Sequence, residues 1–187
     1  NWPKNCEFPF LERNISSLKL LADFTQKESL AAWRRSAKNV TSREKETNVL
    51  HEQSFLVQGN SFENAGHVST QVKALLKKLE LPDDVVRRAA IVTYEAEVNI
   101  CSYAERGKIT LRVTPKFLTI EVTDEGQGIP DVELAMKEGY STATDKIRRM
   151  GFGAGMGLSN MRGFSDTFRI ISEVDKGTRL KMIIRIQ

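Results

Sequence analysis

A carboxylate and an amide stand one helical turn apart in the most regular helical pattern of this sequence, at Glu95 and Asn99. Apolar residues recur around them in steps of three and four, which predicts a helix over residues 83–104 with Asn99 inside its apolar row. Glu95 points to nearly the same side, whereas Glu97 is expected on the opposite side, in water. Buried polar groups need partners. A metal–phosphate group would provide them, and so would a neighbouring loop capped by the pair.

A second carboxylate ends the inward row of a predicted strand at residues 116–123. That row is Leu118, Ile120, Val122 and Asp124. This carboxylate is followed by Gly126, Gly128 and Ile129. Glycines permit a tight turn and the close approach of a flat ligand. A carboxylate at this place suits the exocyclic amine of a purine. The spacing Asp-x-Gly-x-Gly is weak evidence alone, and an ordinary glycine-rich turn also explains it.

A second glycine-rich segment leads directly into a helical pattern. It contains Gly153, Gly155, Met156 and Gly157, with Leu158 near the start of the helix. Bare backbone N–H groups before a helix N-terminus form an anion site, which predicts phosphate binding. No apolar strand leads into the run and no Gly-Lys-Ser/Thr follows it, which argues against a dinucleotide-binding βαβ unit and a P-loop. A flexible loop would explain the glycines, but not their abrupt entry into a helix.

A hydroxyl supplies the fourth polar group. Thr178 follows Gly177 and begins the inward row of the last predicted strand, residues 178–186. We expect its hydroxyl and the Asp124 carboxylate to share a base or a water molecule. Considered alone, Thr178 is also explained as a residue that favours strands.

The elements that must position these groups follow one another regularly from Ser54 onward. Strands are predicted at residues 55–57, 108–114, 116–123, 167–173 and 178–186. Helices are predicted at residues 62–79, 83–104, 132–138 and 156–164. Short turns between adjacent strands favour an α+β fold, a two-layer α/β sandwich in which helices cover one face of a mixed, mainly antiparallel sheet.

The first 53 residues differ in composition from the rest, and we interpret residues 1–53 as a helical N-terminal extension of a domain at residues 54–187. Its apolar residues at helical spacing are Phe8, Phe10, Leu11, Ile15, Leu18 and Leu21. The extension either packs on its own domain or provides a surface for a homodimer or another partner.

The composition excludes several classes of protein. The 187 residues can bury one core, and the net charge of +4 is interleaved along the chain, which argues against direct nucleic-acid binding. No run approaches the ~20 apolar residues that cross a membrane, and no secretory signal is visible. Cys101 falls in an apolar helical pattern far from Cys6, so a buried thiol is expected. A reducing cytoplasm fits these features best.

Together, the four motifs resemble those of the GHKL ATPase superfamily, which includes gyrase, heat-shock chaperones, mismatch-repair proteins and histidine kinases. The motifs are Glu95-x-x-x-Asn99 for the N box, Asp124-x-Gly126-x-Gly128 and Gly153-x-Gly155-x-Gly157 for the two glycine boxes, and Gly177-Thr178 for the final motif. The resemblance covers about residues 54–187 and implies the Bergerat ATP-binding fold. Four motifs in order are far more specific than any one of them.

Within that superfamily, the chain is most similar to bacterial anti-sigma factor kinases and the related switch-protein serine kinases. The segments that carry this likeness are Glu95–Ile100, Gly139–Thr142 and Gly155–Leu158. Anti-sigma factors commonly have His four residues after the Asn, where this chain has Tyr103. Switch kinases tolerate Tyr there, which favours that group and leaves a phosphate contact at Tyr103 in doubt.

The resemblance also implies roles for the site residues. Asn99 would coordinate Mg²⁺ that bridges the phosphates of ATP, and Asp124 would bind the adenine amine with help from Thr178. The residues that would complete the nucleotide pocket are Gly126, Gly128, Ile129, Gly153, Gly155, Met156, Gly157 and Leu158. Glu95 would act as general base toward a serine or threonine hydroxyl of a protein substrate.

Residues 139–153 would form a lid over the phosphates. Its cations Lys146, Arg148 and Arg149 are candidate contacts to phosphates or to a partner, although such cations are more often solvated charges of a lid.

Three functions are compatible with these features. The first is a cytoplasmic serine/threonine protein kinase that phosphorylates a small antagonist protein, with or without sequestration of a sigma factor. The second is an ATP-dependent protein-binding switch without phosphotransfer, in which the lid and the N-terminal extension serve partner exchange alone. The third is a histidine kinase catalytic domain with His51 as acceptor, although His51 lies close to the N box and lacks the helical hairpin that normally presents such a histidine.

Overall fold

The computed structural model describes residues 48–186, apart from the side chain of Lys146. Within them, a five-stranded sheet has the strand order β1-β2-β3-β5-β4, and each neighbouring pair is antiparallel. The strands are β1 (His51–Gln58), β2 (Ala104–Val113), β3 (Phe117–Gly126), β4 (Thr167–Glu173) and β5 (Gly177–Arg185). The predicted α+β fold is confirmed, with a sheet that is antiparallel throughout the described residues.

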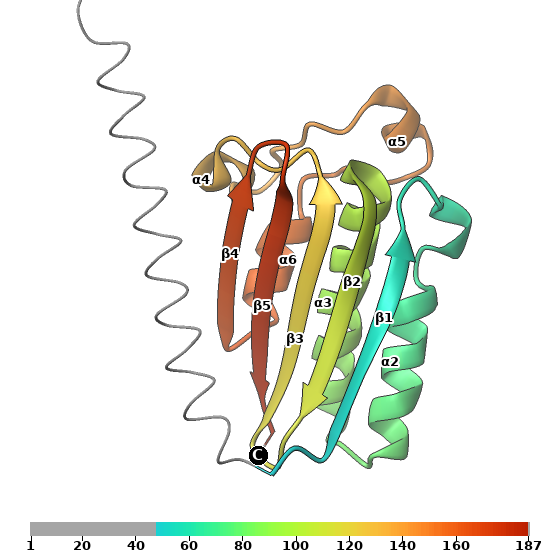
Figure 1. Ribbon diagram of the computed structural model, residues 1–187, viewed down its shortest axis with the longest axis vertical. Coiled ribbons are helices and arrows are strands. Elements are labelled where there is room, and N and C mark those ends of the chain that lie inside the picture. The colour runs from blue at the N-terminus through green and yellow to red at the C-terminus, as the bar shows by residue number, and fades with distance from the viewer. Residues whose placement is uncertain (1–47, 187) are drawn as a thin grey trace, which may run out of the picture. The chain divides into compact units, whose positions relative to one another are not determined.

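Three helices cover one face of this sheet: α2 (His67–Lys78), α3 (Asp83–Tyr103) and α6 (Gly157–Gly163) (Figure 1). Shorter helices lie in the connections, namely η1 (Phe62–Asn64), α4 (Val132–Ala135) and α5 (Asp145–Arg149). The predicted helix at residues 62–79 is divided into η1 and α2 because Gly66 between them has φ of +94°, a left-handed conformation. The predicted two-layer sandwich is confirmed.

The core lies between the sheet and its helices, where the predicted strand alternation places apolar side chains. Ile109, Leu111 and Val113 of β2 face inward and are buried, as are Leu118, Ile120 and Val122 of β3 and Leu180, Met182 and Ile184 of β5. Burying each such side chain contributes about 1.5–3 kcal/mol, so these rows fix which face of each strand meets the helices.

The first strand of the sheet is longer than the strand predicted at residues 55–57. β1 begins at His51 and pairs with β2 along its whole length, from His51 opposite Val113 to Gln58 opposite Arg106. The first residues of β1 are largely exposed and lack apolar alternation, which is why the sequence pattern did not include them. The predicted amphipathic helix near residues 8–21 lies outside the described residues, as does the surface it was expected to offer.

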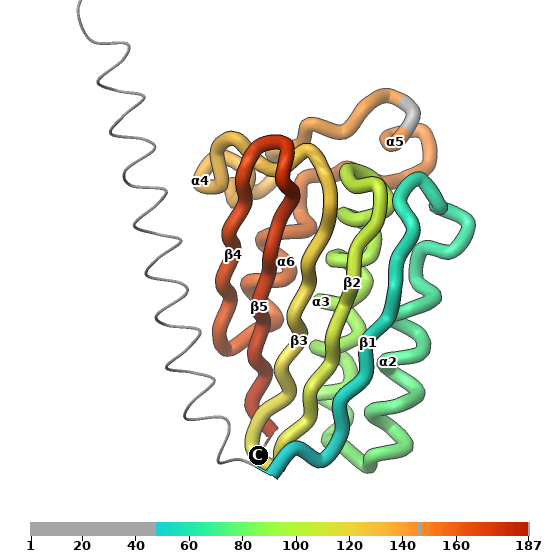
Figure 2. Tube along the Cα trace, in the orientation of Figure 1, coloured from blue at the N-terminus to red at the C-terminus, as the bar shows by residue number. Residues whose placement is uncertain are grey.

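One end of the sheet gathers the connections that carry the predicted motifs. The end of β3 and the β4–β5 turn lie there, together with α4 and α5 (Figure 1). The chain can be followed in Figure 2 from β3 through α4 and α5 into α6. At that end Gly126 pairs with Ala104, directly after α3. Among the described residues, no helix has the length and apolar character needed to cross a membrane.

Candidate functional site

Glu95 and Asn99 lie together on α3, both half-buried, and the start of α6 lies against them. A Cβ atom on Gly157 would come within 3.3 Å of Glu95 Oε2 and 3.4 Å of Asn99 Oδ1, so a residue without a side chain leaves room there. The side-chain amide of Asn160 donates to Glu95 Oε1 at 2.7 Å. The N box and the second glycine segment therefore meet at one place.

Glu97 differs from its prediction, because its side chain is buried rather than in water, with 2% of the residue exposed. Its carboxylate accepts hydrogen bonds from the backbone N–H groups of Val68 at 3.0 Å and Ser69 at 3.1 Å. Both belong to the first turn of α2, where N–H groups have no partner within the helix. The helical spacing correctly placed Glu97 on a different side of α3 from Glu95. That side is covered by α2 and is not exposed to water.

Asp124 ends the inward row of β3, as predicted, and is half-buried. The backbone N–H of Thr178 donates to Asp124 Oδ1 at 3.1 Å. Burial raises the pKa of the Asp124 carboxyl above its ordinary value, and hydrogen bonds from the backbone N–H groups of Thr178 and Gly126 partly offset this. A Cβ atom on Gly126 would lie 3.0 Å from Asp124 Oδ1, and a Cβ atom on Gly177 would lie 2.9 Å from the same oxygen. Both glycines thus allow their backbones to approach the carboxylate.

Ser172 on β4 joins the first glycine box to the final motif. Its Oγ accepts a hydrogen bond from the Ile129 backbone N–H at 2.8 Å and lies 2.8 Å from Thr178 Oγ1. The same hydroxyl lies 3.1 Å from the carbonyl oxygen of Gly177, to which it can donate. The buried Ser172 therefore fixes the position of the hydroxyl of Thr178, whose backbone N–H donates to Asp124.

Ser172 and Asn160 were not predicted as site residues, although the sequence holds a signal for Ser172. Phe168, Ile170 and Ser172 alternate along β4, and the ladder with β5 places Ser172 opposite Thr178. Asn160 follows Gly157 by three residues, which places the two close together at the start of α6. Neither spacing shows which residue the side chain of Ser172 or of Asn160 contacts.

The end of α3 connects the two halves of the site. The Tyr103 carbonyl oxygen accepts a hydrogen bond from the Gln127 backbone N–H at 3.4 Å. A Cβ atom on Gly126 would lie 2.6 Å from that same carbonyl oxygen. Asn99, one turn earlier on α3, is therefore held close to the glycine box that follows Asp124.

Residues 139–155 form a loop whose two ends are tied together. The Gly139 backbone N–H donates to the Gly155 carbonyl oxygen at 3.0 Å. Gly155 has φ of +75°, and a Cβ atom there would come 2.5 Å from the Gly139 carbonyl carbon. The predicted lid therefore has a narrow neck that requires glycine at Gly155.

The predicted lid segment has internal hydrogen bonds and also contacts the connection between β1 and α2. Arg148 donates to the carbonyl oxygens of Ala143 at 3.1 Å and Ser141 at 3.4 Å, so its guanidinium is bonded within the lid. The ring of Phe152 stacks on that of Phe62 in η1, with 5.5 Å between the ring centroids. Arg149 is exposed, and the Lys146 side chain lies outside the described part of the chain.

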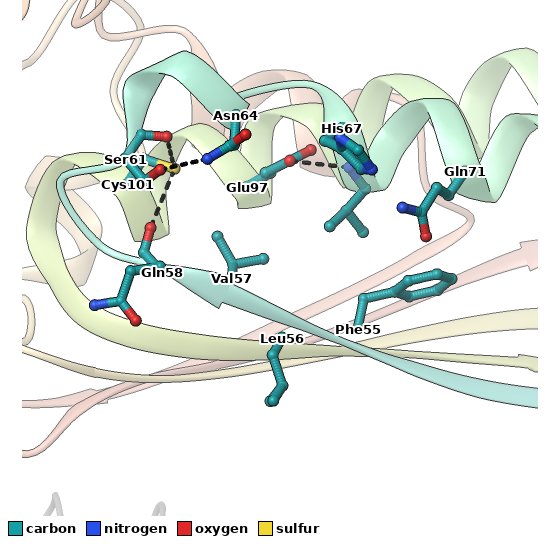
Figure 3. A pocket seen from close by; sticks show the side chains of 11 residues that line it. Phe55, Leu56, Val57, Gln58, Ser61, Asn64, His67, Gln71, Glu97 and Cys101 are labelled. Carbon is teal, nitrogen blue, oxygen red and sulfur yellow. Dashed lines mark hydrogen bonds between the residues drawn. The ribbon is translucent and has the colours of Figure 1, made fainter.

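A separate cavity of about 400 Å³ lies between β1 and α2 (Figure 3). Some of its polar groups bond to one another: Cys101 Sγ lies 3.8 Å from the Gln58 carbonyl oxygen and 3.7 Å from that of Ser61, and Asn64 donates to Ser61 Oγ at 2.7 Å. Burial and then the nearby Glu97 charge raise the pKa of the Cys101 thiol. The predicted burial of Cys101 is confirmed, and none of the predicted nucleotide-binding residues lines this cavity.

Comparison with known families identifies the kind of domain that carries this site. The model of the histidine kinase-, DNA gyrase B- and HSP90-like ATPases matches residues 84–187, more than half of the chain. The protein belongs to this ATPase family. Membership of this family implies that the domain binds ATP. It also confirms the superfamily inferred from the four motifs.

Several relatives of this ATPase-family chain have named roles. The anti-sigma F factor of Caldanaerobacter subterraneus subsp. tengcongensis is 32% identical over 142 residues, which cover 73% of this chain and 94% of that protein. The anti-sigma F factor of Clostridium acetobutylicum is 31% identical over 125 residues, covering 64% and 84%. The serine/threonine-protein kinase RsbT of Bacillus subtilis is 33% identical over 110 residues, covering 56% and 77%.

Proposed function

We propose that the protein is an ATP-dependent serine/threonine protein kinase that phosphorylates a small antagonist protein and also sequesters a sigma factor. Its similarity to proteins named anti-sigma F factor and serine/threonine-protein kinase supports this proposal. The half-buried carboxylate of Glu95 beside Asn99 and Gly157 is the single observation that carries it. A module that only bound nucleotide would not require a carboxylate beside the metal ligand.

The residues present fit ATP with Mg²⁺. Gly157 leaves open the space next to Asn99, whose amide oxygen is a hard donor of the kind that Mg²⁺ accepts. Mg²⁺, when bound, neutralises charge on the phosphates of ATP. Asn99 would hold the ion. Asp124, which accepts a hydrogen bond from the Thr178 backbone N–H, would accept another from the adenine amine, and the Thr178 hydroxyl would assist.

The remaining proposed contacts come from backbone. The glycine segment at Gly153, Gly155 and Gly157, with Met156 and Leu158, would surround the phosphates, and Gly126, Gly128 and Ile129 would line the adenine end. In the transfer step, the substrate hydroxyl oxygen bonds to the γ-phosphorus while the bond between that phosphorus and the oxygen of ADP breaks. Glu95 accepts the proton that the hydroxyl loses.

An ATP-dependent binding switch without phosphotransfer is the second candidate, because a lid tied at a narrow neck could also govern partner exchange. The histidine kinase alternative is less well supported. His51 pairs with Val113, whereas Gly126 pairs with Ala104. The strand between Val113 and Ala104 spans about 30 Å at ~3.3 Å per residue, so His51 lies far from the site within its domain.

The proposal is tested by incubating the full chain with labelled ATP and with the proteins encoded next to its gene. We expect label on a serine or threonine of one of these proteins. Glu95→Gln should reduce the transfer rate by about 100-fold or more while ATP affinity changes little, because the lost group is a general base. Asp124→Asn should instead weaken ATP binding by about tenfold, as expected for a lost hydrogen bond to a charged group.

Two results would contradict the kinase proposal, and a third would contradict the role of Glu95 in it. Partner binding that depends on ATP, without label on the partner, would favour the switch. Acid-labile label on His51 would favour the histidine kinase. Transfer that survives Glu95→Gln unchanged would remove Glu95 from the chemistry.

A further inference from the structure

We infer that Asn160 is the positioning residue for Glu95, holding the carboxylate so that a single oxygen faces the reacting groups. The inference rests on the proposed kinase function, in which Glu95 is the general base. The hydrogen bond from Asn160 Nδ2 to Glu95 Oε1, at 2.7 Å, joins residues 65 positions apart in the sequence. This hydrogen bond links a side chain of α6 to a side chain of α3, and the inference depends on it.

The donor comes from a helix that is fixed in the core. Met161, the next residue on α6, is fully buried, and Leu158 of α6 and Phe164 directly after the helix pack against the core. The backbone N–H of Asn160 donates to the Met156 carbonyl oxygen at 2.8 Å, which sets its place in the first turn. The backbone that carries the Asn160 side chain is therefore held by packing and hydrogen bonding that do not involve Glu95.

This bond gives the two oxygens of Glu95 different environments. Oε1 is occupied by Asn160, and Oε2 faces Gly157, 3.3 Å from the position of a Cβ atom there. Asn99 Oδ1 lies on the same side, 3.4 Å from that position. A glutamate side chain otherwise has several rotatable bonds, so one bond to a fixed donor restricts it strongly. Oε2 is thereby presented beside the metal ligand.

Neighbouring residues cannot replace this arrangement. Glu97 is two positions away, but its carboxylate is already bonded to Val68 and Ser69 on α2. The exposed Arg162 of α6 offers a matched control, because it belongs to the same helix as Asn160. Asparagine also suits the role chemically, since its amide donates a hydrogen bond without a proton that the carboxylate can remove at neutral pH.

Steady-state kinetics of the full chain test the inference. Asn160→Ala and Asn160→Asp should lower kcat by about 10- to 100-fold with little change in the KM for ATP, because misplacement of a reacting group reduces the rate. Asn160→Gln keeps the donor and should recover part of the loss, and Arg162→Ala should leave both constants unchanged. In a Glu95→Ala background, Asn160→Ala should cause no further loss.

A second readout needs neither nucleotide nor activity. In ¹H–¹⁵N spectra of the nucleotide-free chain, Glu95→Ala should shift the Asn160 side-chain amide signals and speed their hydrogen exchange, whereas Arg162→Ala should not. The inference is overturned if those signals do not respond, or if kcat is unchanged in Asn160→Ala while Glu95→Gln abolishes transfer. If the wild-type chain transfers no phosphate to any partner, the proposed function fails, and the amide signals still decide whether the pair exists.

Discussion

At the scale of single residues, two glutamates two positions apart on α3 have different roles because different helices lie opposite them. Glu95 is half-buried and meets Asn160 of α6. Glu97 is almost fully buried and accepts two backbone N–H groups of α2. Gly66, which precedes α2, has no side chain to cap that helix, so Glu97 supplies the missing acceptor from another part of the chain.

This difference predicts that the same substitution affects stability at Glu97 much more than at Glu95. Glu97→Gln should lower the free energy of unfolding by about 1–2 kcal/mol, because an amide replaces one acceptor oxygen with a donor that faces buried N–H groups. Glu95→Gln should change it by less than about 0.5 kcal/mol, since the Gln oxygen can still accept from Asn160. Denaturant unfolding of both variants measures the two values. Equal stabilities would show that Glu97 does not cap α2.

At the scale of elements, the spacing of apolar residues correctly predicted features that depend on neighbouring residues in the chain. The alternation in residues 167–173 predicted a strand with the bounds that β4 has, and the apolar rows of β2 and β5 face inward as expected. α5 was missed, because residues 139–153 lack apolar periodicity and their order comes from contacts such as those of Arg148 with Ser141 and Ala143.

The site divides in the same way between local and long-range causes. The four-residue step places Glu95 and Asn99 together, and two-residue alternation places Asp124 at the end of an inward row. The partners of these residues come from elsewhere: Asn160 is 65 positions from Glu95, and Thr178 is 54 from Asp124. A periodic pattern says which side of an element a residue faces, but not which element covers that side.

The neck of the lid gives a prediction at this scale. Gly155→Ala should destabilise the lid, because a Cβ atom would meet the Gly139 backbone at 2.5 Å and the residue has φ of +75°. Gly151→Ala is a matched control, since Gly151 has φ of +86° but no atom within 4 Å of its Cβ position. We expect the control to cost only the ~1–2 kcal/mol of a left-handed conformation.

Hydrogen exchange of the amides in residues 139–155, together with ATP affinity, measures both variants. Faster exchange and weaker ATP binding are expected in Gly155→Ala well beyond those in Gly151→Ala. If the two variants behave alike, the close approach of Gly139 and Gly155 does not control the lid.

At the scale of the whole molecule, the proposed ATP site joins elements that are separate in the sequence. α3 contributes Asn99, β3 contributes Asp124, and β5 contributes Thr178, while the glycine segment lies at the start of α6. These groups come together only in the folded chain, so a ligand that contacts all of them binds the folded state alone. Such binding stabilises the fold by mass action.

Thermal unfolding of the full chain therefore reports on the site without a protein substrate. ATP at 100 times its dissociation constant should stabilise the fold by ~2.7 kcal/mol. That increment should raise Tm by roughly 5–15 °C for a domain of this size. Chelation of Mg²⁺ should reduce the shift, and in Asn99→Ala the reduced shift should no longer depend on Mg²⁺. A full shift without Mg²⁺ would contradict the role of Asn99, because it would mean that the adenine end, with Asp124 and Thr178, supplies the binding energy.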